Sequence, residues 1–186
     1  GAKAQQALGW TYSIGKGVEK NQTKAVKWYR KAAEQGFAKA QFDLARCYTN
    51  GMGVKQDHKL PAQWVRKAAN QKFGPAQFYL ARCYADGRGV ERDQKQAIQW
   101  VRKAAGQGFA PGQVNLGWRY LNGKGLARDP KQAAIWYGKA AEQGYVNGQY
   151  GLAYCYIKGI GVEQDDTEAV KWYRKAAEQG LAAAQD

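Results

Sequence analysis

The sequence predicts an all-α protein, a solenoid of about five helix–turn–helix repeats. One observation is a nine-residue stretch, WYRKAAEQG at Trp28–Gly36, that returns letter for letter at Trp172–Gly180. A second is the spacing of the tryptophans that begin this stretch and its three blurred copies, 36 residues every time: Trp28, Trp64, Trp100, Trp136 and Trp172. A strict period of this length indicates stacked supersecondary units and not one globular core.

The period divides the chain into one continuous array over residues 1–186. We expect repeats at about 2–37, 38–73, 74–109, 110–145 and 146–181, with the start of a sixth first helix at 182–186. No apolar run approaches the roughly 20 residues that a membrane-spanning helix needs.

The first helix of each repeat is best seen in the second copy, at about Ala38–Asn50. Ala40, Leu44 and Tyr48 fall on one face at helical spacing, which predicts the buried face. The leucine recurs in every repeat, and a small residue always follows it: Gly9, Ala45, Ala81, Gly117 and Ala153. We expect this small residue to let a second helix approach closely.

A turn with two glycines follows each first helix, at Gly15 and Gly17 in the first repeat. All ten equivalent positions are glycine, which predicts backbone conformations that a Cβ atom would forbid. An apolar residue comes next, and we expect it to fill the space under the turn: Val18, Val54, Val90, Leu126 and Val162.

The second helix of each repeat should begin after a residue that caps helix N-termini well: Asn21, Asp57, Asp93, Asp129 and Asp165. Glycines such as Gly36 are suited to end it. The second copy departs twice, with Pro61 where other repeats have alanine and Lys72 where they have glycine. We therefore expect its second helix to start late or to end loosely.

Two further columns of the repeat have structural interpretations. A glutamine near the start of each first helix is expected to satisfy loop backbone groups between repeats: Gln5, Gln41, Gln77, Gln113, Gln149 and Gln185. Three cysteines share one position of the period, and packed helices lie about 8–10 Å apart, farther than a disulfide spans. They are predicted to be separate thiols: Cys47, Cys83 and Cys155.

The repeated pattern A-x-x-L-[GA]-x-x-Y, G-x-G-V and D-x-x-x-A-x-x-W-Y-x-K-A-A-E-Q-G resembles the Sel-1-like repeat family, a relative of the tetratricopeptide repeat. The resemblance implies a right-handed superhelix of antiparallel helix pairs with the first helices on its concave face. It also implies a bacterial adaptor that binds proteins or peptides, with envelope, signalling or toxin-neutralising roles. This favours a periplasmic over a cytoplasmic setting. The disulfide-bonded branch of the family is not indicated, because its cysteine pairs are missing.

Catalytic and metal chemistry find little support in the composition. The lone histidine, His58, stands at the expected start of a second helix beside Asp57, and we interpret it as a solvated residue. One histidine and three separated cysteines make no metal-ligand cluster. The G-x-G turns lack the Lys-Ser/Thr continuation of a phosphate-binding loop. We therefore expect no enzyme, no cofactor, no metal and no small-molecule substrate.

Basic residues form two columns on the outer face of the second helices, in a chain with a formal net charge of +14. The columns are Lys31, Lys67, Lys103, Lys139 and Lys175, and Arg30, Arg66, Arg102 and Arg174. They are either an electrostatic strip for an acidic protein, nucleic acid or anionic lipid, or simply a solvated face. Nucleic acid is the weaker interpretation, because no recurrent aromatic platform is expected between the charges.

The exposed face of the first helices is the predicted binding site. One of its columns contains Phe42, Phe78, Val114 and Tyr150, after Gln6, and the next contains Trp10, Arg46, Arg82, Trp118 and Tyr154. Aromatic residues and arginine are typical of interface hot spots, although some rings could instead fold onto neighbouring repeats. The sequence thus predicts a non-catalytic module that binds a protein, an acidic one by its charge. The alternative is a binder of nucleic acid or anionic surfaces.

Overall fold

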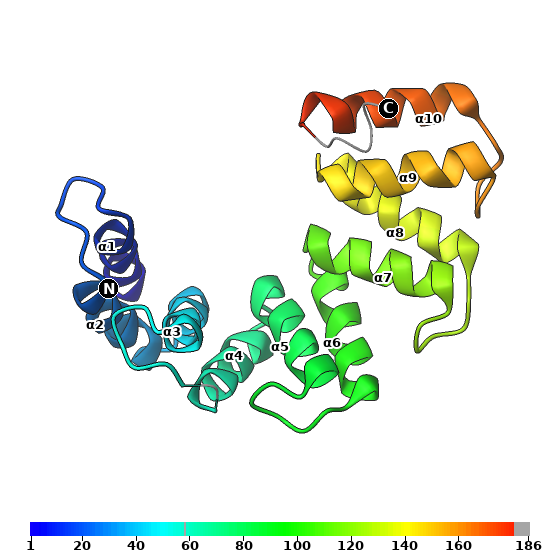
Figure 1. Ribbon diagram of the computed structural model, residues 1–186. Helices are drawn as coiled ribbons and strands as arrows, with labels where there is room; N and C mark the ends of the chain where they lie inside the picture. Colours follow the sequence, from blue (N-terminus) through cyan, green and yellow to red (C-terminus); the bar gives the residue numbers. More distant parts are fainter. Residues whose placement is uncertain (58, 181–186) are drawn as a thin grey trace. The chain divides into compact units, whose positions relative to one another are not determined.

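The computed structural model describes residues 1–57 and 59–180, which form ten α-helices and no strand (Figure 1). The first helices of the repeats, called A helices below, are α1 (Ala2–Ile14), α3 (Ala38–Asn50), α5 (Gly74–Asp86), α7 (Ala110–Asn122) and α9 (Val146–Lys158). The second, or B, helices are α2 (Gln22–Glu34), α4 (Leu60–Asn70), α6 (Gln94–Gly106), α8 (Pro130–Glu142) and α10 (Asp166–Glu178). The predicted all-α repeat fold is confirmed. The expected sixth A helix lies outside the described residues.

The helices divide into two compact units, Gly1–Trp100 and Val101–Asp186, with α6 contributing to both. In the first unit each helix from α1 to α5 packs against its neighbours along the chain, and in the second α7 to α10 do the same. Each unit has an alanine-rich core with a few large side chains, Tyr29 and Leu44 in the first and Tyr137 and Leu152 in the second. Small residues allow this close packing, because a Cβ atom on Gly9 would lie 2.7 Å from the Tyr29 ring.

The B helices begin where the capping residues predict. Asn21, Asp129 and Asp165 each accept a hydrogen bond from the backbone amide three residues on, at 2.9–3.0 Å. The exception is α4, which is two residues shorter than the 13-residue B helices on either side and begins at Leu60. The expected late start is therefore confirmed.

The other alternative, a loose end of α4, is not what the structure shows. This helix ends at Asn70, one period after Glu34 ends α2. Lys72 takes a left-handed φ of 63°, the conformation that Gly36 adopts with a φ of 85° in the preceding repeat. A lysine can thus replace the glycine, at the steric cost that a Cβ atom brings in this region.

The paired turn glycines all have positive φ, as predicted. The first glycine ends the A helix in a left-handed conformation, and the second brings the turn against the preceding repeat. A Cβ atom on Gly53 would lie 2.4 Å from the Gln22 carbonyl at the start of α2. Gly17 occupies the same position in the first repeat, and an added Cβ would meet nothing within 4 Å. At Gly53 the second glycine is therefore a contact between repeats.

The recurring glutamine satisfies backbone groups between repeats, as predicted. Gln41 donates from Nε2 to the Ala33 carbonyl at 3.2 Å and accepts at Oε1 from Gln71 at 2.9 Å. Gln113 repeats the arrangement in the second unit, donating to Ala105 and accepting from Gln143. Gln185 lies outside the described residues. The cysteines are free and buried, as expected.

Candidate functional site on the exposed helix faces

The exposed column of the A helices begins in the first unit on α1, α3 and α5. Trp10 keeps 44% of its surface exposed, and Arg46 and Arg82 are exposed at the equivalent positions of the next two repeats. The Lys16 ammonium lies 5.9 Å from the centre of the Trp10 ring. The first unit therefore presents an indole and two guanidinium groups on successive A helices. These residues and their counterparts in the second unit are called the A-helix column.

The second unit has two aromatic residues at the same position of the repeat. Trp118 on α7 is 46% exposed and Tyr154 on α9 is 38% exposed. Exposed large apolar side chains that recur at one position of a repeat are candidates for a contact surface. The composition of the column, tryptophan, tyrosine and arginine, is that of residues that dominate binding energies at protein interfaces.

The neighbouring column is not the open surface that the sequence suggested. Phe42 is half-buried, and its ring packs edge-on against Phe73 and Tyr79 at centroid distances of 5.8 and 5.9 Å. In the second unit Val114 packs against the core, and the Tyr150 ring lies 5.3 Å from Tyr173. The expectation of two exposed columns is thus correct for the A-helix column and wrong for this one. Phe78 is likewise half-buried.

Gln6 also departs from the expected exposed face, because its side chain is buried between repeats. Its Nε2 donates a 2.7 Å hydrogen bond to the Asp43 carboxylate on α3. Burial raises the pKa of Asp43, while the Gln6 bond and the charges of Lys39 and Arg46 act in the opposite direction. Asp43 is therefore a half-buried polar link between the first two repeats, next to Arg46 of the A-helix column.

The basic face of the B helices carries a feature that the sequence analysis missed. In four repeats the lysine lies over the tryptophan three residues earlier on the same helix. Its Nζ lies 4.6 Å from the ring centre for Lys31 on Trp28 and 4.5 Å for Lys67 on Trp64. Lys139 and Lys175 do the same at 4.3 and 4.1 Å. The sequence predicted no recurrent aromatic platform between these charges, whereas a tryptophan ring recurs beneath these lysines. The signal was the Trp-x-x-Lys spacing, since residues three apart are neighbours on a helix surface.

Two arginines of the second column are tied to the next repeat. Arg30 on α2 donates from Nη2 to the Tyr48 hydroxyl at 2.5 Å, and Arg66 on α4 donates to the Tyr84 hydroxyl at 2.9 Å. Both arginines remain exposed. The basic face is therefore solvated, as expected of such a face, but its side chains are held in place by rings of their own helix or of the next repeat.

Neither a metal-binding cluster nor a membrane-spanning helix is found among the described residues. Among residues 1–57 and 59–180, no group of three or more His, Cys, Asp or Glu side chains could hold a metal ion. Within the same ranges, no helix has the length and apolar character needed to cross a membrane. His58 lies outside the described residues.

The chain belongs to the Sel1 repeat family, whose sequence model matches residues 2–37, 38–73, 74–109, 110–145 and 146–181. Sel1 repeats are typically protein-interaction modules. A comparison with curated proteins found no match.

Solved structures with the same fold include a Sel1 repeat protein from Oxalobacter formigenes, 38% identical, with a TM-score of 0.86 over 99% of this chain and 73% of that one. A protective antigen present in uropathogenic Escherichia coli strains is 40% identical, with a TM-score of 0.89. The match covers 99% of this chain and 39% of the antigen, so the chain spans well under half of it. An immunity protein from Pseudomonas aeruginosa is 25% identical, with a TM-score of 0.68 over 98% of this chain and 66% of that one.

Proposed function

We propose that this protein is a non-catalytic binding module that holds a protein partner along the A-helix column. The observation that carries the proposal is the exposure of Trp10, Trp118 and Tyr154 at one repeated position, which Arg46 and Arg82 occupy in the remaining repeats. Rigid aromatic rings bury much area on binding at a low entropic cost, and arginine can donate a forked pair of hydrogen bonds to a carboxylate or carbonyl group.

The partner is proposed to be acidic. The chain has a formal net charge of +14, to which the A-helix column contributes two guanidinium groups and no carboxylate. Complementary charge speeds the encounter of partners and disfavours like-charged competitors. The half-buried neighbours of the column, Phe42, Phe78, Val114 and Tyr150, support the helices that present it.

An immunity role is one specific form of this proposal, in which the acidic partner is an effector protein that the chain sequesters. It is supported by the resemblance of the fold to the immunity protein of Pseudomonas aeruginosa. An adaptor that joins two proteins would use the same column, and identification of the partner separates the two.

The alternative function is the binding of nucleic acid or anionic surfaces by the basic face of the B helices. Its support is the column of exposed lysines that lie over tryptophan rings. Against it, each of these rings already has an ammonium group over it, and Arg30 and Arg66 donate to tyrosine hydroxyls. Stacking of bases on aromatic rings, which supports single-strand binding elsewhere, would have to displace the lysines.

The experiment is a comparison of Arg82→Ala and Trp118→Ala with the parent. Partners are captured on the parent chain, identified by mass spectrometry and titrated by calorimetry. We expect each variant to weaken the binding of the captured protein by about 2 kcal/mol or more. Thermal stability should change little, because both side chains are exposed. Lys139→Ala, on the B-helix face, is the matched control. If it weakens binding while the two column variants bind like the parent, the A-helix column is not the site.

A further inference from the structure

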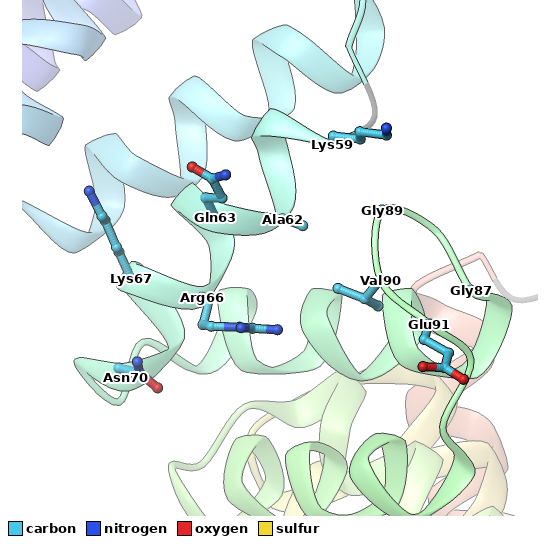
Figure 2. Close-up of a pocket in the computed structure, with 10 residues that line it drawn as sticks. All are labelled: Lys59, Ala62, Gln63, Arg66, Lys67, Asn70, Gly87, Gly89, Val90 and Glu91. Carbon is cyan, nitrogen blue, oxygen red and sulfur yellow. The ribbon is translucent and has the colours of Figure 1, made fainter.

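The surface of the first unit has two similar grooves. Each lies between a B helix and the glycine turn of the next repeat. The α4 groove has a volume of about 910 Å³ and is shown in Figure 2, where Arg66 extends from α4 toward the turn that carries Val90. The α2 groove has a volume of about 470 Å³ and lies between α2 and the turn that carries Gly53 and Val54. Neither groove includes a residue of the A-helix column.

The two grooves are built from equivalent residues of successive repeats. Eight lining positions of the α2 groove return in the α4 groove after one period of 36 residues, as the pairs Thr23/Lys59, Val26/Ala62, Lys27/Gln63, Arg30/Arg66, Lys31/Lys67, Glu34/Asn70, Gly53/Gly89 and Val54/Val90. A hollow in the second unit is lined in part by the same positions, with Lys131, Gly159 and Gly161 in the places of Lys59, Gly87 and Gly89. The groove is therefore a product of the repeat.

The shape of the groove follows from the contact between repeats. The second glycine of the turn lies against the start of the preceding B helix, so the turn forms one wall and the outer face of that helix forms the other. The arginine crosses between them and donates to the tyrosine hydroxyl of the next repeat, as Arg66 does to Tyr84 at 2.9 Å. Its guanidinium group is thereby held at the groove, with donors remaining for a ligand.

Both grooves combine positive rims with small apolar floors. The α4 groove has three cationic side chains, Lys59, Arg66 and Lys67, and one carboxylate, Glu91. The α2 groove has four, Lys24, Lys27, Arg30 and Lys31, and one carboxylate, Glu34. Val26 and Ala62 are buried at the helix side of each groove, and Val54 and Val90 are half-buried at the turn side.

We propose that these two grooves bind one extended peptide segment of a partner protein, in which acidic side chains alternate with small apolar ones. The carboxylates would lie on the lysine and arginine rims, where charge-assisted hydrogen bonds are strongest, and the apolar side chains on the valine and alanine floors. Side chains of an extended strand point alternately to opposite sides, so such a segment presents one kind to the floor and the other to the rim. A continuous phosphate backbone fits less well, because it has no apolar group for the floors and would meet Glu34 and Glu91.

The spacing of the grooves sets the length of the segment. Packed helices lie about 8–10 Å apart, and α2 and α4 both pack against α3, so the grooves are about 10–20 Å apart. An extended chain advances about 3.3 Å per residue, so about three to six residues join one groove to the next. A segment of about 12 residues, roughly 40 Å long, reaches both.

The test is a fluorescence anisotropy titration with three labelled probes, each with six negative charges: a dodecapeptide of alternating glutamate and valine, one of alternating glutamate and serine, and heptathymidylate. The groove variants are Lys59→Gln/Lys67→Gln and Lys27→Gln/Lys31→Gln, all at exposed positions. The control, Lys3→Gln/Lys20→Gln, removes the same charge at exposed positions of the first unit that lie outside both grooves and outside the A-helix column. Melting curves verify that each variant folds.

We expect the glutamate–valine peptide to bind the parent at least threefold more tightly than the other probes. Each groove variant should raise its Kd about tenfold, and the control should leave it within twofold. Val90→Ala should weaken binding of the glutamate–valine peptide and leave binding of the glutamate–serine peptide unchanged. Equal losses in the control and groove variants would overturn the proposal in favour of net charge alone. Preference for heptathymidylate with the same groove dependence would overturn it in favour of a polyanion site, and absence of peptide binding would remove it. None of these outcomes bears on the A-helix column, which is tested with its own partner.

Discussion

Substitution of Gly53 by alanine tests whether the second turn glycine joins one repeat to the next. Gly53 has a φ of 69°, and a Cβ atom there would lie 2.4 Å from the carbonyl carbon and oxygen of Gln22. Both atoms belong to backbone at the start of α2, so neither can move aside as a flexible side chain would. The turn must therefore withdraw from the preceding repeat or distort it.

The first repeat supplies the matched control. Gly17 has nearly the same φ, 74°, but a Cβ atom there would meet nothing within 4 Å. Gly17→Ala should therefore show only the strain of a left-handed alanine, about 1–2 kcal/mol. Gly53→Ala adds a forced displacement of packed structure, for which about 1–3 kcal/mol is typical. We expect the free energy of unfolding to fall further for Gly53→Ala than for Gly17→Ala, by about 1–3 kcal/mol.

The assay is urea unfolding of both variants, followed by circular dichroism and by limited proteolysis. Cleavage in the turn around Gly53 should appear at lower urea in Gly53→Ala than in the parent. The second unit offers a replicate, because a Cβ atom on Gly161 would lie 2.0 Å from the Pro130 carbonyl oxygen. Equal losses for Gly17→Ala and Gly53→Ala would refute the reasoning, since the shared backbone strain would then account for both.

Three further predictions follow from the core and the backbone. Lys72→Gly should raise the free energy of unfolding by about 1 kcal/mol by relieving the left-handed φ of 63°, and an unchanged urea midpoint would contradict this. Leu80→Ala should lower the free energy of unfolding by about 2–5 kcal/mol, because it leaves a cavity in the core. Arg82→Ala should lower it by less than about 0.5 kcal/mol. Differential scanning calorimetry of the two variants measures the difference. Burial raises the pKa of all three thiols from 9.0 to about 11, so the unfolded state loses its thiol protons first and stability should fall as pH rises from about 9 to about 11. Urea midpoints across this pH range measure the loss of stability. The controls are alanine variants of the three thiols, Cys47, Cys83 and Cys155.

Much of the fold could be predicted from the sequence, because the same capping, turn and apolar residues recur every 36 residues. Capping residues such as Asp129 act on amides within three positions, so they fix the start of a B helix without help from elsewhere. Turn glycines are readable for the same reason, because a positive φ is a property of one residue. Pro61 and Lys72 marked the irregular repeat, although only the late start of α4 followed.

The burial of each side chain depends on its contacts with the neighbouring repeat. No local sequence pattern describes these contacts. Phe42 and Arg46 lie one helical turn apart, yet Phe42 packs against Phe73 at the end of its own repeat and against Tyr79 of the next repeat, while Arg46 stays exposed. The grooves arise the same way, since their two walls come from different repeats. The helices, their boundaries and the positions that could form a site follow from local sequence. Which of these positions remain at the surface follows from the packing of the repeats, because burial is set by residues about 30 or more positions away along the chain.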